Sequence, residues 1–282
     1  MNKLNLFSLN QALAHGANDL TQSPTAQLDS QLILLFALDA HRNILFTDPE
    51  QLLSQGQQDH FLALIARRKN GEPVAYLIGT QGFWDLDLKV SPHTLIPRAD
   101  TESLIEWLLE QPLKPKNILD LGTGTGALAL ALAGEYSNAH VIGIDVVEQA
   151  VVLARENKIL NNVNNVIFKQ SNWFDAINRD QKFDLIVSNP PYIDSDDHHL
   201  NEGDVRFEPS SALVAAQSGY ADLFKISLDA KGYLNKGGCL IMEPGWQQAP
   251  KVRERLIELG YQNVGSGLDL AGHERFTFGF KQ

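Results

Sequence analysis

Short continuous runs of apolar residues recur through the last two thirds of the chain, and segments with helical spacing of apolar positions lie between most of them. Such runs indicate buried strands, and their alternation with helices predicts an α/β fold with a parallel or mixed sheet covered on both faces. The expected strands are residues 117–120, 140–145, 166–169, 183–188, 239–243, 261–265 and 275–280, with helices over 127–133, 220–233 and 247–259. Because no long helix separates the last two strands, they are expected to form an antiparallel hairpin.

The first 75 residues show a helical pattern instead. Asp29-Ser30 is expected to cap a buried helix over residues 31–38. A second helix over residues 57–69 is expected to end at Asn70-Gly71.

Between these parts the period changes to the alternation of strands. Residues 74–78 and 83–90 show strand-like spacing of apolar positions, and Thr80-Gln81-Gly82 is expected to be the turn between them. The pattern therefore predicts three parts: an N-terminal helical domain (1–75), a β-hairpin linker (76–97) and a sheet domain (98–282).

The charge of the chain limits its partners. The 282 residues carry a formal net charge of -11 at pH 7 and 44% of them are hydrophobic, which is enough for a sizeable core. A duplex-DNA-binding protein needs a basic surface that displaces counterions. The acidic balance therefore argues against direct nucleic-acid binding and suits a basic protein partner.

Nothing at the start of the chain predicts export or a membrane. Residues 1–10 are mixed in character, and the longest apolar run, residues 32–38, is too short to span a bilayer. The single cysteine, Cys239, lies in an apolar run and is expected to be a small core residue. We therefore expect a cytoplasmic protein without a membrane partner, acting as a monomer.

A glycine-rich loop is the first candidate site. Gly122-Thr123-Gly124-Thr125-Gly126 connects an expected strand to an expected helix. Glycine lets backbone N–H groups approach a ligand closely, and the positive end of the helix faces the same point. The G-x-G-x-G spacing is shorter than the dinucleotide fingerprint, and such loops also serve as simple turns. Alone, the loop gives only a weak indication of a nucleoside site.

Two residues on the following strands strengthen this interpretation. Asp145 ends the next strand, where a carboxylate can accept both hydroxyl hydrogen bonds of a ribose, although a capping aspartate is the alternative. Trp173 follows the strand after that and can flank an adenine ring, although tryptophan commonly packs in a core. The combination of loop, strand and acid favours a cofactor site.

The stretch Asn189-Pro190-Pro191-Tyr192 follows the strand expected at 183–188. An amide or adenine amino nitrogen is a poor nucleophile because its lone pair is delocalised, so a site that methylates it must bind both N–H groups. The Asn189 oxygen and the Pro190 carbonyl can accept these bonds, the prolines stiffen the loop, and Tyr192 can pack against the substrate plane. With the glycine loop, this predicts methyl transfer from S-adenosylmethionine to such a nitrogen, without a strong base.

With further stretches, these motifs make the chain resemble the peptide chain release factor N5-glutamine methyltransferases over nearly its whole length. The stretches are Gly71-Glu72-Pro73, Tyr76-Leu77-Ile78-Gly79, Leu95-Ile96-Pro97-Arg98, Asp100-Thr101-Glu102, Asp120 to Gly126, Ser171 with Trp173-Phe174, Asn189 to Ile193 and Arg206-Phe207-Glu208-Pro209. Each is a weak signal alone, and the ordered set is specific. Ala99, Asn172 and Pro244 depart from the family's usual residues but leave the Asn189 loop intact.

The resemblance implies a small helical domain, a β-hairpin linker and a seven-stranded, Rossmann-like class I methyltransferase domain dependent on S-adenosyl-L-methionine. It implies methylation of the glutamine in the Gly-Gly-Gln motif of release factors, which end translation, with the N-terminal domain and linker helping to hold that protein. Carried over by position, the cofactor contacts are Gly122, Thr123, Gly124, Thr125, Gly126, Asp145, Trp173 and Asn189. The substrate glutamine would meet Asn189, Pro190, Pro191 and Tyr192, with Asn189, Pro190 and Tyr192 as the catalytic residues.

Other functions fit parts of the pattern. A DNA adenine methyltransferase uses the same motif but needs a basic face and usually a target-reading module. A methyltransferase of a ribosomal-protein glutamine needs identical chemistry, and the catalytic domain discriminates it poorly. A catalytically silent cofactor-binding protein has no need of Asn189 and Tyr192 beside the cofactor.

A loop rich in potential metal ligands follows the Asn189 stretch. It contains Asp194, Asp196, Asp197, His198 and His199. Their order matches no recognised ligand spacing, so a solvated loop without metal is expected.

Overall fold

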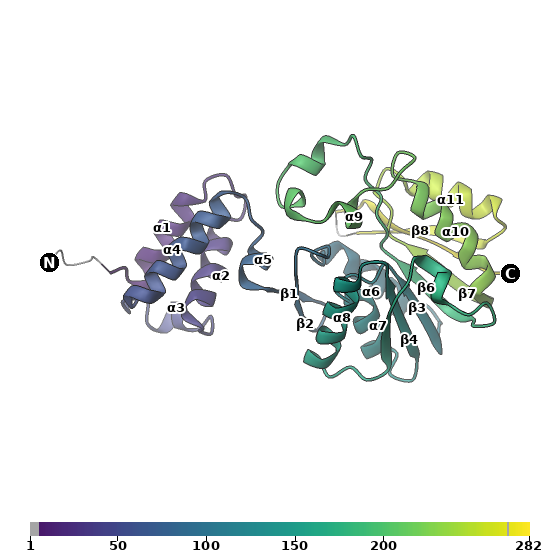
Figure 1. Ribbon diagram of the computed structural model, residues 1–282, viewed down its shortest axis with the longest axis horizontal. Coiled ribbons are helices and arrows are strands. Elements are labelled where there is room, and N and C mark those ends of the chain that lie inside the picture. Colours follow the sequence, from purple (N-terminus) through teal and green to yellow (C-terminus); the bar gives the residue numbers. More distant parts are fainter. Residues whose placement is uncertain (1–5, 270) are drawn as a thin grey trace. The chain divides into compact units, whose positions relative to one another are not determined.

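The computed structural model describes residues 6–269 and 271–282 and divides into two compact units, Met1–Gly79 and Thr80–Gln282 (Figure 1). The helices of the first unit are α1 (Leu9–Asp19), α2 (Ala26–Leu38), α3 (Ile44–Thr47), α4 (Gln55–Lys69) and α5 (Val74–Ile78). Ser8 and Ser54 begin α1 and α4 with capping boxes, in which the serine and a glutamine three residues later satisfy each other's backbone N–H groups. Leu9, Ile33 and Phe61 lie at the centre of this unit's core.

The helix cap expected at Asp29-Ser30 is wrong. Helix α2 begins at Ala26, so both residues lie in its first turns. The Asp29 carboxylate pairs with the Arg68 guanidinium of α4 at 2.7 Å, and the Ser30 hydroxyl donates to the Leu13 carbonyl. Their polar groups hold neighbouring helices together rather than capping a helix end.

The strand expected at residues 74–78 is also wrong, because this segment is helix α5. Pro73 occupies its N-cap and Gly79 its left-handed C-cap, and these residues delimit a short helix that packs Leu77 into the first unit's core. The expected turn at Thr80-Gln81-Gly82 lies within a strand. The hairpin itself is present, with β1 (Thr80–Phe83) antiparallel to β2 (Leu86–Lys89) and its turn at Trp84-Asp85.

The second unit is built on the seven-stranded sheet expected from the family resemblance. Its strands are β3 (Asn117–Leu121), β4 (His140–Asp145), β5 (Val166–Gln170), β6 (Phe183–Ser188), β7 (Leu234–Met242), β8 (Gln262–Leu268) and β9 (Glu274–Phe280). They lie in the order β5-β4-β3-β6-β7-β9-β8. The first five strands in this order, from β5 through β4, β3 and β6 to β7, are parallel to one another. Strands β8 and β9 form the expected antiparallel hairpin at the edge.

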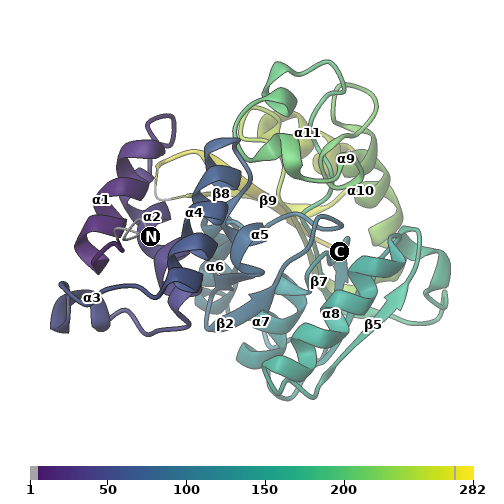
Figure 2. The ribbon, with the colours of Figure 1, turned by 60° about the vertical axis from the view of Figure 1, so that its left-hand side comes forward.

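Helices cover both faces of this sheet, as predicted (Figures 1 and 2). One face packs against α6 (Glu102–Glu110), α7 (Ala127–Glu135) and α8 (Glu148–Leu160), and the opposite face against α10 (Ala221–Tyr233) and α11 (Ala249–Glu258). Helix α7 is buried from Ala127 to Ala133, because it lies between the sheet, α6 and the hairpin. No helix among residues 6–269 and 271–282 is long and apolar enough to cross a membrane.

The strand order places a binding crevice at a defined point. The chain runs outward from β3 to β4 and β5 on one side and returns to β6 and β7 on the other. Where the strand order reverses, the loops after β3 and β6 separate to opposite faces and leave a crevice at the carboxyl ends of the strands. The glycine-rich loop and the Asn189 loop are the two that flank it.

Candidate active site

A pocket of about 290 Å³ lies at this crevice and brings together most of the residues predicted from sequence. Its lining includes Gly122, Thr123, Gly124, Thr125, Asp145, Trp173, Asn189 and Pro191. Gly126, Pro190 and Tyr192 are outside the lining. Gly126 begins α7 and Pro190 is buried, while Tyr192 packs against the core on the α10 side of the sheet.

The glycine-rich loop has the backbone conformation that its sequence predicts. Gly124 has a φ of +55°, and a Cβ there would meet no atom within 4 Å, so its open side lets a ligand approach the backbone. Gly126 has a φ of +86°, and a Cβ there would lie 3.0 Å from the Phe168 ring. Gly124 exposes the loop to the pocket, and Gly126 lets α7 pack closely on the sheet.

Asp145 holds the loop from the neighbouring strand. Its Oδ2 accepts the Gly124 N–H at 2.9 Å, and its Oδ1 accepts the Val147 N–H at 2.9 Å. Burial is the main influence on this carboxyl, and it raises the pKa. Each carboxylate oxygen has a second lone pair, so both can still accept a hydrogen bond from a ligand in the pocket.

Asp120 is a pocket residue to which the sequence pattern assigned no role. Its side chain is 1% exposed, its Oδ2 accepts the Thr123 hydroxyl at 2.6 Å, and its Oδ1 has no hydrogen-bond partner. Burial raises the pKa of this carboxyl to about 7. An unpartnered buried carboxylate oxygen at a pocket wall suits a cationic ligand group, such as an ammonium.

Trp173 lines the pocket next to the glycine-rich loop. Its backbone adopts a φ of +47°, rare for a bulky residue, and the Ser171 hydroxyl donates to its carbonyl at 2.7 Å. Burial raises the pKa of the Asp222 carboxyl of α10, and the neighbouring Trp173 indole opposes that shift; the indole ring lies 3.5 Å from where a Gly122 Cβ would be. The indole therefore forms a flat wall beside the glycine-rich loop.

The Asn189 loop is tied to the strands on both sides of it. The Ser188 hydroxyl donates to the Leu121 carbonyl at 2.8 Å, and the Ser188 carbonyl accepts the Glu243 N–H at 3.0 Å. Further along, the Gln248 side chain donates to the Tyr192 carbonyl at 3.0 Å. These bonds set the position of Asn189 before any ligand arrives.

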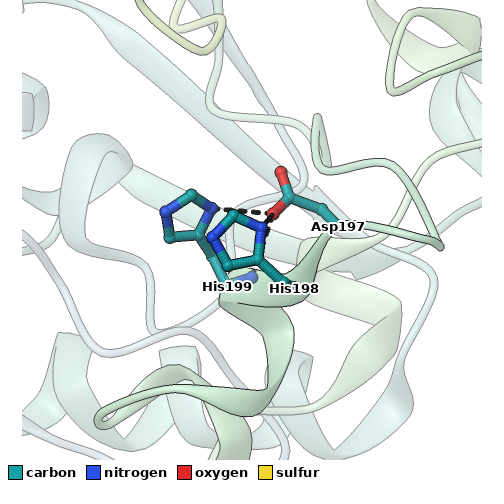
Figure 3. Close-up of side chains that lie close together, drawn as sticks. All are labelled: Asp197, His198 and His199. Carbon is teal, nitrogen blue, oxygen red and sulfur yellow. Dashed lines mark hydrogen bonds and ion pairs between the residues drawn. The ribbon is translucent and has the colours of Figure 1, made fainter.

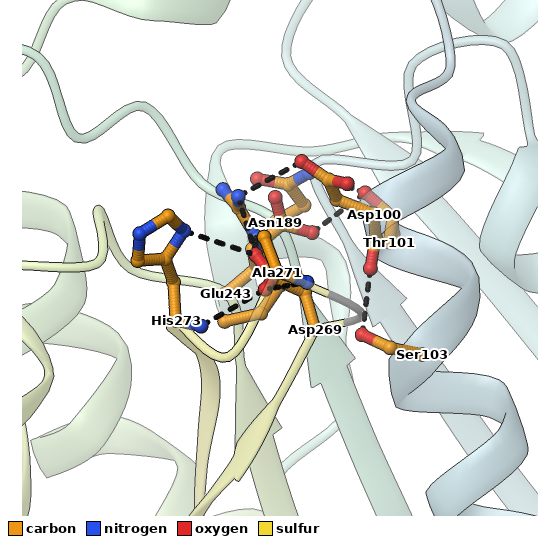
Figure 4. Close-up of polar contacts among 9 residues, drawn as sticks. Asp100, Thr101, Ser103, Asn189, Glu243, Asp269, Ala271 and His273 are labelled. Atoms are coloured by element: carbon orange, nitrogen blue, oxygen red, sulfur yellow. Dashed lines mark hydrogen bonds and ion pairs between the residues drawn. The ribbon is translucent and has the colours of Figure 1, made fainter.

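Behind the loop lies a polar network that includes Thr101 and Glu243, and it connects to Asp100, Asp269 and His273 (Figure 4). Near it, Arg98 at the pocket wall forms an ion pair with the buried Glu208, whose Oε2 lies 2.6 Å from the guanidinium nitrogen. Arg98 and Thr101 lie more than a hundred positions from their partners Glu208 and Glu243, and spacing alone gives no signal for such pairs.

Gly219 is expected to be essential for the shape of the Asn189 loop. Its φ is +81°, and a Cβ there would lie 2.0 Å from the Tyr192 carbonyl oxygen. Gly203 has a φ of +53° but open space around it, so Gly203→Ala shows only the left-handed backbone penalty of about 1–2 kcal/mol. Urea unfolding should show a distinctly larger loss for Gly219→Ala. Equal losses of stability in Gly219→Ala and Gly203→Ala would contradict the expected clash between a Cβ at position 219 and the Tyr192 carbonyl.

The loop of potential metal ligands brings three side chains together. Asp197, His198 and His199 have ligand atoms within 4.8 Å of one another (Figure 3). The Asp197 side chain caps a short 3-10 helix by accepting the His199 N–H, and His199 Nδ1 lies 2.7 Å from the same oxygen. Both imidazoles are exposed, as expected of a solvated loop.

Comparisons with known proteins agree with this architecture. A family model described as a methyltransferase domain matches residues 113–261, and one described as a PrmC N-terminal domain matches residues 11–79. A solved methyltransferase from Pyrococcus furiosus superposes with a TM-score of 0.52 at 22% identity, covering 78% of this chain and 97% of that one. At that identity the likeness shows the fold alone.

Curated relatives are much closer. The release factor glutamine methyltransferase of Aliivibrio fischeri is 50% identical over 262 residues, which is 92% of each chain. That of Vibrio cholerae is 47% identical over 275 residues, which is 96% of each. With this identity over nearly full length, and with the pocket at the point where the fold places it, the chain belongs to the release factor glutamine methyltransferase family.

Proposed function

We propose that this protein transfers a methyl group from S-adenosyl-L-methionine to the side-chain amide nitrogen of the glutamine in the Gly-Gly-Gln motif of peptide chain release factors, and thereby supports translation termination. The observation that supports this most strongly is that Asn189 and Pro191 line the same pocket as the glycine-rich loop and Asp145. The groups suited to a nucleoside and those suited to a planar amide therefore face one cavity.

The pocket residues fit S-adenosylmethionine in three ways. The unpartnered Asp120 Oδ1 suits the ammonium of its amino-acid part. The free lone pairs of Asp145 suit the ribose hydroxyls, and the flat Trp173 indole suits the adenine. When bound, this cofactor supplies an electrophilic methyl group on a positively charged sulfur. S-adenosyl-L-homocysteine is then the product.

The Asn189 loop performs the remaining chemistry. The Asn189 side-chain oxygen and the Pro190 carbonyl each accept a hydrogen bond from the substrate NH2 group, which orients the nitrogen lone pair toward the cofactor. As positive charge develops on that nitrogen, these fixed acceptors stabilise it without reorganising. Pro191 and Tyr192 shape the loop that receives the amide plane. The nitrogen proton becomes acidic during transfer and leaves afterwards to water.

The parts of the chain have distinct proposed roles. The helical unit that contains residues 1–75 binds the protein substrate, and residues 98–282 form the catalytic domain. The β1–β2 hairpin lies in the expected linker, residues 76–97, between them in the sequence. The net charge of -11 favours a protein substrate over DNA. We place the reaction in the cytoplasm, with a monomeric enzyme that binds release factors and contacts neither a membrane nor nucleic acid directly.

Methyl transfer to purified proteins tests the substrate. Labelled S-adenosylmethionine is supplied with release factor, with a Gly-Gly-Gln→Gly-Gly-Ala release factor, with ribosomal proteins and with duplex DNA. We expect label on the intact release factor and none on the other three. Label confined to DNA or to a ribosomal protein would keep the Asn189 loop assignment and overturn the substrate.

A further inference from the structure

Three side chains lead away from the pocket behind Asn189. The Asn189 Nδ2 lies 3.5 Å from the Thr101 hydroxyl oxygen, and that hydroxyl donates to Glu243 Oε2 at 2.6 Å (Figure 4). Thr101 is 4% exposed and Glu243 is 2% exposed, so solvent has little access to either group. The first contact is long, as hydrogen bonds of an active site often are before its substrate binds.

These three residues come from rigid elements that are distant in sequence. Thr101 ends a short 3-10 helix just before α6, Asn189 follows β6, and Glu243 follows β7. The Glu243 N–H bonds the Ser188 carbonyl at 3.0 Å, so the two strand ends are in fixed register. This backbone bond fixes the ends of β6 and β7 relative to each other, and the Thr101 hydroxyl contacts the Asn189 and Glu243 side chains that follow them.

The number of protons in this chain decides how the Asn189 amide is oriented. A threonine hydroxyl has one proton. When Glu243 is ionised, that proton goes to the carboxylate, and the Thr101 oxygen can only accept. Asn189 must then turn its NH2 group toward Thr101, because its oxygen would find no donor there. The Asn189 Oδ1 is left available to the pocket.

We propose that Thr101 and Glu243 are positioning residues for the Asn189 amide, keeping its NH2 toward Thr101 and its Oδ1 free to accept a hydrogen bond from the substrate nitrogen. This inference rests on the proposed function for its role in catalysis. Donation along a chain that ends on a negative charge also raises the electron density on Oδ1, which makes it a better acceptor.

The positive charges near Glu243 only partly offset the effect of burial on its carboxyl group. Burial raises the pKa of this carboxyl to about 7, against the lowering effects of the Thr101 hydrogen bond, Arg275 and Arg98. Arg275 does not serve Glu243 alone, because its guanidinium pairs with Asp100 at 2.8 Å and with Asp269 at 2.9 Å. Asp100 opposes ionisation of Glu243, and the Tyr192 phenol faces the same charge.

A protonated Glu243 removes the constraint on the amide. The carboxyl can then donate to Thr101, and the Thr101 proton is free to bond the Asn189 oxygen. Both orientations of the amide become acceptable. The fixed orientation is therefore present when Glu243 is ionised and is lost as the pH falls through about 7.

Kinetics of methyl transfer to release factor test the positioning role. Thr101→Val should lower kcat by roughly 10- to 100-fold with little change in KM, since one charge-linked hydrogen bond is lost. Thr101→Ser should restore most of the rate, and Glu243→Gln should lose it as Thr101→Val does. Thr277→Val removes a buried hydroxyl that, unlike that of Thr101, lies outside the pocket lining, and it should keep the wild-type rate.

A spectroscopic measurement separates Glu243 from Asp120, whose pKa is also about 7. The Asn189 NH2 resonance is followed by NMR across this pH range in protein labelled at asparagine nitrogen, with Asn189→Ala giving the assignment. We expect it to shift near pH 7 in the wild type and to lose this shift in Glu243→Gln and in Thr101→Val.

The outcomes distinguish this inference from the proposed function. An Asn189 resonance that does not titrate, or one that titrates equally in Thr101→Val, overturns the inference whatever the substrate is. An unchanged kcat in Thr101→Val overturns it too. A wild type that leaves release factors unmethylated but shows the titration transmitted through Thr101 would overturn the substrate and support the positioning of Asn189.

Discussion

Asn189→Ala is expected to lower kcat for methyl transfer by about 100- to 1,000-fold, the loss typical of removing one preorganised acceptor or donor at a developing charge. The side-chain oxygen matters most in the transition state, when the substrate nitrogen becomes positive. In the ground state the amide N–H bonds water equally well. An interaction made mainly in the transition state contributes little to ground-state binding. The affinity for S-adenosylmethionine should therefore change by less than about threefold.

Single-turnover rates and calorimetric titration of S-adenosylhomocysteine separate these effects. Asn178→Ala is a suitable control, because Asn178 is exposed and lies outside the pocket lining. An equal loss of turnover and cofactor affinity in Asn189→Ala would show that Asn189 serves chiefly to bind the cofactor. The control should match the wild type in both measurements.

Asp145→Ala is expected to weaken cofactor binding by about 100-fold or more. The variant loses two hydrogen bonds to a charged acceptor, each worth about 1.5–3 kcal/mol. It also removes the partners of the Gly124 and Val147 N–H groups, which loosens the glycine-rich loop. The change acts on the ground state, so kcat at saturating cofactor should fall much less than the affinity.

Calorimetric titration of S-adenosylhomocysteine gives this affinity directly. Asp145→Asn is the matched variant, since it keeps one oxygen acceptor and the side-chain shape, and it should show an intermediate loss. An Asp145→Ala protein that binds the cofactor with unchanged affinity would remove Asp145 from the proposed ribose contact.

The sheet could be predicted from sequence because parallel strands buried on both faces appear as continuous apolar runs. Strands β4 and β6 match the expected residues 140–145 and 183–188 at both ends. Strand β7 begins at Leu234, five positions before the expected start, because Gly237-Gly238 interrupts its apolar pattern. That irregular start is held by the Gly237 N–H, which donates to the Lys281 carbonyl.

Segments whose structure depends on distant partners were predicted less well. The apolar run at 74–78 fits a strand or a helix equally, and its packing into the first unit decides for a helix. Asp29 was interpreted as a cap, but its partner Arg68 lies 39 residues away. Local patterns contain no information about such pairs.

The candidate site shows the same division. Gly124, Asp145 and Asn189 were identified because each lies at or shortly after the end of a recognisable strand, and the carboxyl ends of parallel strands meet at one edge. Asp120, Thr101 and Glu243 acquire their roles from burial and from contacts across the fold. Their carboxylates and hydroxyl are ordinary in the sequence and become distinctive only when water is excluded.

The most direct test of the central claim is tandem mass spectrometry of release factor after incubation with this protein and S-adenosylmethionine. We expect a single added methyl group on the side-chain amide nitrogen of the glutamine in the Gly-Gly-Gln motif. The Asn189→Ala protein should leave that peptide unmodified over the same time. A methyl group on another residue, or none with the wild-type protein, would contradict the proposed function.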